Sequence, residues 1–181
     1  MKHDAYTINE RNQLDILLNK LGSLRRSLEQ PFPEVGTEPA YWYKYLDNVK
    51  ESQGNLHIWI SFIACLMAKD YITHKYNVTG WDVAEKAQGA PGLDIDIKTG
   101  NGKNIIGEIK TTTPYEKDDF GAAQWTSLER DFEKLRQHNA GIKYLFVTNE
   151  VAYKYLERDR DYIRVIGLKV VLLPSGKTFT V

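Results

Sequence analysis

The sequence has little of several features that mark particular classes of protein. Its one cysteine, Cys65, has no partner for an internal disulfide, which favours a cytoplasmic protein. Lys plus Arg and Asp plus Glu both number 24, so the chain has no net charge and lacks the basic excess of many nucleic-acid-binding domains. The longest apolar run, at residues 58–67, is too short to span a membrane. These absences predict a soluble protein in which any contact with nucleic acid comes from a local patch.

The motifs of several common enzyme classes are also missing. The chain has no zinc-ligand spacing, no P-loop, no glycine pattern of a dinucleotide-binding turn and no Gly-x-Ser-x-Gly elbow. It has 181 residues, of which 42% are hydrophobic, and it contains no internal repeat or long linker. This length and composition predict one globular domain over residues 1–181.

The first part of the chain, residues 1–53, is expected to be helical. Leucines recur at alternating steps of three and four residues within a helix expected at 8–29, which is the pattern of a heptad seam. The seam consists of Leu14, Leu17, Leu21, Leu24 and Leu28. Pro31 and Pro33 cannot continue this helix, and a shorter one is expected at 39–51. The seam predicts either the contact of a homodimer or an amphipathic helix that packs on its own domain.

Residues 54–181 mix helical and strand patterns. Helices are expected at 54–75, 119–139 and 150–158, and strands at 80–84, 93–97, 104–111, 142–148 and 163–173. This order predicts an α/β fold in which a central mixed β-sheet is flanked by helices.

The hairpin expected around residues 99–103 carries the residues with the clearest chemical use. Asp94 and Asp96 are two apart on its first strand, and Glu108 and Lys110 are two apart on its second, so each pair shares a face of the sheet. Mg²⁺ is usually held by one or two protein carboxylates, together with waters and substrate phosphates. Such an ion polarises a phosphate and lowers the pKa of a water, while a lysine can neutralise the developing charge. The hairpin therefore predicts a site for phosphodiester hydrolysis, although cross-strand salt bridges are an alternative reading of the same charges.

The order Asp94, then Glu108-Ile109-Lys110, resembles the motif of the PD-(D/E)XK nuclease superfamily, which includes many type II restriction endonucleases. Leu93-Asp94 stands where the family often has Pro-Asp, and Pro91 lies three residues before Asp94. The element order over about residues 54–173 also matches: a helix, a hairpin, a helix and a strand. The resemblance implies a restriction-endonuclease-like core at 54–181.

The resemblance also implies roles for individual residues. Asp94 and Glu108 are implied as ligands of Mg²⁺, or of Mn²⁺ as a substitute, with the Ile109 carbonyl as a further ligand. Asp96 is implied either as an outer ligand or in place of Asp94, and Lys110 is implied as the catalytic lysine. Residues that could contact DNA backbone phosphates follow the motif: Thr111, Thr112, Thr113, Lys117 and Gln124.

The expected function is a Mg²⁺-dependent endonuclease, of the type II restriction class, that cuts double-stranded DNA as a homodimer. A dimer with two-fold symmetry places one site on each strand of a palindrome. Two alternatives remain open from the sequence. One is a nuclease of the same superfamily in repair, recombination or mobile-element processing, and the other is a noncatalytic nucleic-acid-binding module.

Overall fold

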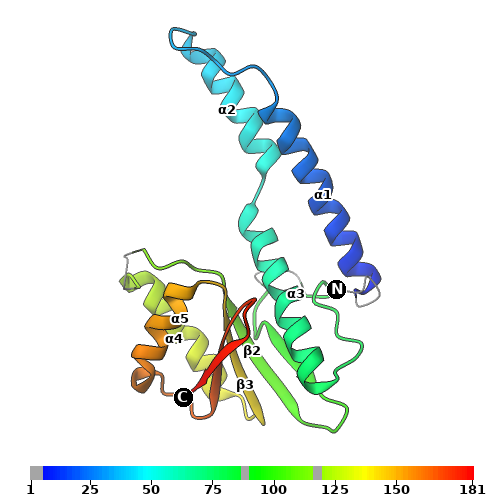
Figure 1. Cartoon of the computed structure of the whole chain (residues 1–181), viewed down its shortest axis with the longest axis vertical. Coiled ribbons are helices and arrows are strands. Elements are labelled where there is room, and N and C mark those ends of the chain that lie inside the picture. The colour runs from blue at the N-terminus through cyan, green and yellow to red at the C-terminus, as the bar shows by residue number, and fades with distance from the viewer. Residues whose placement is uncertain (1–5, 87–89, 116–119) are drawn as a thin grey trace. The chain divides into compact units, whose positions relative to one another are not determined.

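The structure is a computed structural model that describes residues 6–86, 90–115 and 120–181 (Figure 1). Its helices are α1 (Ile8–Leu28), α2 (Pro39–Gln53), α3 (Leu56–Tyr76), α4 (Ala122–Gln137) and α5 (Glu150–Arg158), with a short 3₁₀ helix at Arg160–Tyr162. Its strands are β1 (Ile95–Lys98), β2 (Asn104–Lys110), β3 (Ile142–Val147), β4 (Leu168–Leu172) and β5 (Lys177–Thr180). The chain divides into two compact units, residues 1–59 and 60–181.

The first unit is a hairpin of two helices, α1 and α2. A capping box begins α1, because the Thr7 hydroxyl accepts the Glu10 N–H at 3.1 Å and the Glu10 carboxylate accepts the Thr7 N–H at 2.9 Å. The two helices contact one another, and the hydroxyls of Ser27 and Ser52 are 2.6 Å apart between them. Tyr45 is the one large hydrophobic side chain that is buried among the described residues 6–59. This unit therefore has almost no core of its own.

The second unit is built on a mixed five-stranded sheet with the order β1-β2-β3-β4-β5. β1 pairs with β2 and β4 pairs with β5 in antiparallel fashion, whereas β2, β3 and β4 run parallel. Parallel neighbours need a crossover, and α4 and α5 supply the two crossovers. The expected α/β class with a mixed sheet flanked by helices is confirmed.

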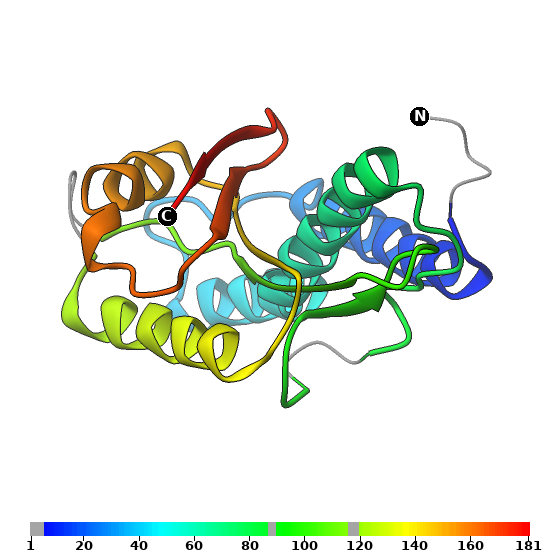
Figure 2. The same ribbon diagram turned by 90° about the horizontal axis from the view of Figure 1, so that it is seen from below.

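Each face of the sheet is covered by helices, as Figure 2 shows. Ile106 and Leu145 point toward α4 and α5 and pack with residues such as Leu128 and Leu135 of α4. The alternate positions of the strands, which include Ile105, Tyr144 and Phe146, pack against Ala68 and Ile72 of α3. Apolar residues on both faces explain why β2 and β3 read as nearly continuous hydrophobic runs. The α4 side of the sheet is the face that carries Glu108.

Gly107 allows β2 to lie close to its neighbours just before Glu108. A Cβ at this position would lie 3.2 Å from the Tyr144 carbonyl oxygen and 3.2 Å from Cδ1 of Ile95. Both distances are shorter than ordinary van der Waals contacts, so a side chain here would push β2 away from β1 or β3. The glycine thereby allows the close packing of the strands next to Glu108.

Two expected strands differ from the structure. Residues 80–84 form turns rather than a strand, because Gly80 has φ 77° and the Ala84 N–H donates to the Asp82 carboxylate at 2.9 Å. The last strand, expected at 163–173, is the shorter β4, and β5 follows it after a turn at Pro174 and Gly176 that the sequence reading missed.

The helical run Pro39–Tyr76 contains an 18-residue window with a mean hydropathy of 1.2, which by length and composition alone would suffice to cross a membrane. This is weak evidence, since the core helix of a soluble protein passes the same test. Phe62, Ala64, Leu66, Ala68 and Ile72 of α3 are buried in the protein, and Ala68 and Ile72 belong to the core under the sheet. Of the 18-residue window, 28% is buried inside the protein.

Candidate active site

Asp94 lies directly before β1 and reaches the neighbouring strand β2. Its Oδ2 accepts the Ile109 N–H at 2.9 Å, although the residue itself is exposed. The N–H and C=O of one strand residue point to the same side, so the Ile109 carbonyl also faces Asp94. The pairing of Ile95 with Gly107 places Asp94 opposite Glu108 at this end of the hairpin. The structure thus brings together the three predicted ligands Asp94, Glu108 and Ile109.

Glu108 is a buried carboxylate, with 2% of its surface exposed. Burial raises its pKa, and the negative charges of Asp94 and Asp131 raise it further, while a hydrogen bond from Lys134 lowers it; the result is a pKa of about 8. A carboxyl group in a folded protein ordinarily titrates near pH 4. A pKa perturbed by burial and by specific charges is typical of functional sites.

Lys110 lies two residues after Glu108 on the same face, but it contacts α4 instead of the two predicted metal ligands. Its Nζ is 2.7 Å from Oδ2 of Asp131 and donates to the Ser127 hydroxyl at 2.8 Å. The side chains of Lys110 and Asp131 are 19% and 8% exposed, so this ion pair is largely shielded from water.

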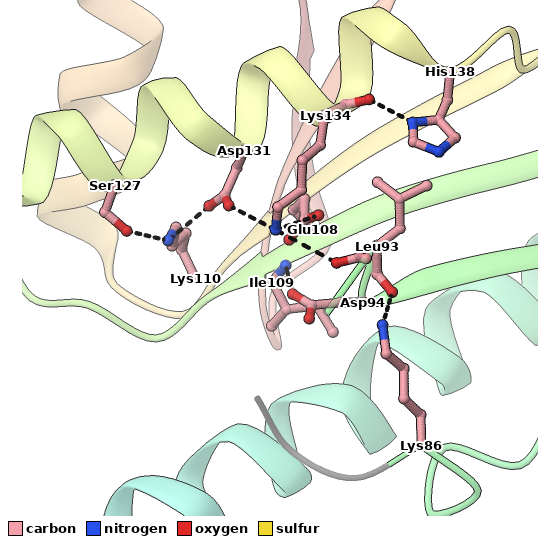
Figure 3. A network of polar contacts seen from close by, with 11 residues as sticks. Lys86, Leu93, Asp94, Glu108, Ile109, Lys110, Ser127, Asp131, Lys134 and His138 are labelled. Carbon is pink, nitrogen blue, oxygen red and sulfur yellow. Dashed lines mark hydrogen bonds and ion pairs between the residues drawn. The ribbon is translucent and has the colours of Figure 1, made fainter. Parts of the chain in front are cut away.

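Lys134 of α4 supplies the ion pair to Glu108. Its Nζ is 3.1 Å from Oε1 of Glu108 and 3.3 Å from Oδ1 of Asp131, and it lies between the two carboxylates in Figure 3. Burial opposes the charged form of Lys134, but the hydrogen bond and charge of Glu108 and the charge of Asp131 outweigh this and raise its pKa. Two carboxylates, Glu108 and Asp131, and two ammonium groups therefore form one network, with Asp131 bridging the lysines (Figure 3).

Sequence reading missed Ser127, Asp131 and Lys134 as members of this network. They recur at steps of four and three on α4, which places them on one stripe of the helix. Leu128, Phe132 and Leu135 form the adjoining buried stripe. A polar stripe beside the apolar one was visible in the sequence, but such a stripe ordinarily faces solvent.

The other predicted residues lie outside this network. Asp96 is exposed on β1, opposite Ile106, and shares a face with Asp94. Thr111 and Thr112 are half-buried after the end of β2, and Thr113 is exposed. Lys117 lies outside the residues that the structure describes.

The side-chain amide of Gln124 forms hydrogen bonds with the main chain that follows the motif. Its Nε2 donates to the Thr113 carbonyl at 2.9 Å, and its Oε1 accepts the Tyr115 N–H at 3.3 Å. Asn149 adds a bond of 3.4 Å to the Thr113 hydroxyl. These contacts give Gln124 a structural role in holding the segment that follows Lys110.

The oxygen atoms of this site suit a hard cation in number and type. Within the described ranges, no three His, Cys, Asp or Glu side chains gather closely enough to form a complete cage for a metal ion. Mg²⁺ does not require one, because one or two carboxylates together with waters and substrate oxygens complete its shell. Asp94, Glu108 and the Ile109 carbonyl are oxygen groups of this kind, and a buried Glu108 carboxylate gains most from a nearby positive charge.

A pocket of about 700 Å³ opens beside Asp94. Asp96, Trp81, Lys86 and His138 also line it. Asp94 and Asp96 both line this pocket, so solvent and small ligands can reach the two carboxylates through it.

Comparison of the chain with protein-family models, with curated proteins and with solved structures found no match.

Proposed function

We propose that this chain is a divalent-cation-dependent DNA endonuclease of the PD-(D/E)XK type, with a restriction-endonuclease-like core. One observation carries the proposal: Asp94 bonds the backbone of Ile109, directly between Glu108 and Lys110. This contact joins the two halves of the motif, which are separated by thirteen residues in the sequence, into a single site.

Each residue has a defined role in hydrolysis of a phosphodiester bond. Asp94, Glu108 and the Ile109 carbonyl hold Mg²⁺ or Mn²⁺, which when bound polarises the phosphate and lowers the pKa of a water. Glu108 would hold the ion as the deprotonated carboxylate. Lys110 neutralises charge on the phosphate at the transition state, and Asp131 and Ser127 orient its ammonium group.

Double-stranded DNA cut at a specific short site is the proposed substrate, as for a type II restriction enzyme. Long mixed-sequence DNA incubated with the protein and Mg²⁺ should give discrete fragments. A smear would show a nuclease that does not cut at fixed sites, and would favour a role in repair, recombination or mobile-element processing. DNA binding without any cleavage, with either Mg²⁺ or Mn²⁺, would favour a noncatalytic module in which the charges are structural.

The aspartates of the first strand provide a matched test of the site. Asp94→Asn should lower the cleavage rate by at least about 100-fold, because it weakens a metal ligand that is held by the Ile109 N–H. Asp96→Asn changes the same chemical group two residues away, at an exposed position, and should stay within about fivefold of wild type. Initial rates on one linear DNA fragment measure both. Equal losses would mean that Asp96 contributes to cleavage as much as Asp94 does.

We also propose that the α1–α2 hairpin mediates a homodimer. Its described residues bury a single large hydrophobic side chain but expose Ile16, Leu18, Leu21 and Leu46 by 45–65%. Leu18 and Leu21 neighbour one another on α1, and two such hairpins can bury them in a four-helix bundle.

Sedimentation equilibrium should give twice the chain mass of 20.8 kDa. Leu18→Glu should give the mass of one chain, since it places a charge in the interface. Ile166→Glu, at an exposed position of the second unit, should leave the dimer intact. A single-chain mass for the wild-type protein, both with and without DNA, would contradict this assembly.

A further inference from the structure

Lys134 occupies a cation position within the candidate site. Its Nζ has three oxygen neighbours from three parts of the chain: Glu108 Oε1 at 3.1 Å, Asp131 Oδ1 at 3.3 Å and the Gly92 carbonyl at 3.5 Å. These are anionic or carbonyl oxygens, the ligand type that hard divalent cations also prefer. The Lys134 side chain is 40% exposed, so part of it is in contact with solvent.

The motif lysine does not fill this position. Lys110 bonds Asp131 and Ser127, and Lys134 is the cation in ion-pair contact with Glu108 among the residues that the structure describes. Glu108 itself is almost fully buried, so its ionised form depends on a positive partner. In the protein without metal, that partner comes from α4.

We propose that Lys134 is a tethered cation that holds Glu108 in the metal-free protein and competes with the divalent cation for it. The inference rests on the proposed metal site of Asp94 and Glu108. Two cations cannot both lie against one buried carboxylate without strong repulsion. Binding of the divalent ion therefore displaces the Lys134 ammonium from Glu108, while Asp131 continues to hold it nearby.

The competition predicts tighter metal binding when the tethered charge is removed. Mn²⁺ is titrated into the full-length protein, and free Mn²⁺ is measured by its EPR signal, without DNA. Lys134→Gln should lower the Kd for Mn²⁺ by about tenfold, since no fixed positive charge then opposes the metal ion beside Glu108. Lys134→Arg keeps the charge and should bind as wild type does.

Arg130→Gln is the matched control, because it removes one positive charge from an exposed position of the same helix. It should leave the Kd for Mn²⁺ unchanged, which separates competition at Glu108 from a general change in charge. An unchanged or weaker Kd in Lys134→Gln, in a wild-type protein that binds Mn²⁺ and cleaves DNA, would overturn the competition alone. A wild-type protein that neither binds Mn²⁺ nor cleaves would overturn the proposed function with it.

A second measurement uses only the wild-type protein, so it does not depend on how a variant folds. Lysines are acetylated briefly with an N-hydroxysuccinimide ester, with and without saturating Mg²⁺, and the labelled sites are quantified by mass spectrometry. Mg²⁺ should raise labelling of Lys134 severalfold, because it releases the amine from Glu108, and should leave the exposed Lys103 unchanged. Equal labelling of Lys134 with and without Mg²⁺, in protein shown by its melting temperature to have bound the ion, would overturn the proposal.

Discussion

Glu108→Gln is expected to abolish DNA cleavage and, at the same time, to make the metal-free protein more stable than wild type at pH 8. Cleavage should fall by at least about 1000-fold, because the amide is a much poorer ligand for a divalent cation than the carboxylate. Stability should rise because the amide resembles the protonated acid that the buried position favours. A loss of function joined to a gain in stability separates a functional residue from a structural one.

The pH dependence of this gain has a defined sign. Folding raises the pKa of Glu108 from 4.5 to about 8. The contribution of wild-type Glu108 to stability is therefore fully present below pH 4.5, where it is protonated, and is lost as the pH rises toward 8. One pKa unit corresponds to about 1.4 kcal/mol, so the ionised carboxylate costs the metal-free fold up to about 5 kcal/mol at pH 8. Thermal melts of wild type and Glu108→Gln should therefore coincide near pH 4.5 and diverge as the pH rises.

Divalent cation should reverse the order of stability. Mg²⁺ stabilises a protein that binds it only in the folded state, so the melting temperature of wild type should rise and that of Glu108→Gln should not. Glu157→Gln, at an exposed position of α5, is the control and should behave as wild type in all three assays. A destabilised Glu108→Gln at pH 8 would show that the ion pair with Lys134 stabilises the fold more than the burial of Glu108 destabilises it.

Lys110→Met is expected to lower both activity and stability. The variant removes a charge from the reacting phosphate, which should reduce kcat by roughly 100- to 10,000-fold. It also removes the 2.7 Å partner of the buried Asp131 carboxylate, which keeps Lys134 at 3.3 Å, so the loss of stability should be about 1–3 kcal/mol. The two effects are measured by single-turnover cleavage and by denaturant unfolding.

Two further variants separate the effects of Lys110 on activity and on stability. Lys110→Arg keeps the charge opposite Asp131 and should recover most of the lost stability, while cleavage stays low because the guanidinium group is larger and differently placed. Ser127→Ala removes the 2.8 Å hydrogen bond and leaves the charge, so cleavage should fall by less than about tenfold. Full activity in Lys110→Met protein that remains folded would rule out a catalytic lysine at this position.

The hairpin and its charges could be predicted from local sequence because strand geometry has a period of two residues. Alternation alone places Glu108 and Lys110 on one face, and the turn at Gly102 places Asp94 across from them. The nearly continuous apolar runs of β2 and β3 predict that both strands are buried. β5 was missed because it has four residues, of which only Phe179 is buried, and it follows a proline.

What the sequence by itself determined is therefore the local chemistry: two carboxylates and a lysine on a hairpin, within an α/β chain. The tertiary structure alone decided which groups those residues contact. The packing of α4 on β2 brings Asp131 and Lys134 to the site, pairs Lys110 with Asp131 and gives Glu108 a different lysine. These contacts depend on the rotation and depth at which a helix settles on a sheet, and side-chain packing across the whole core sets both.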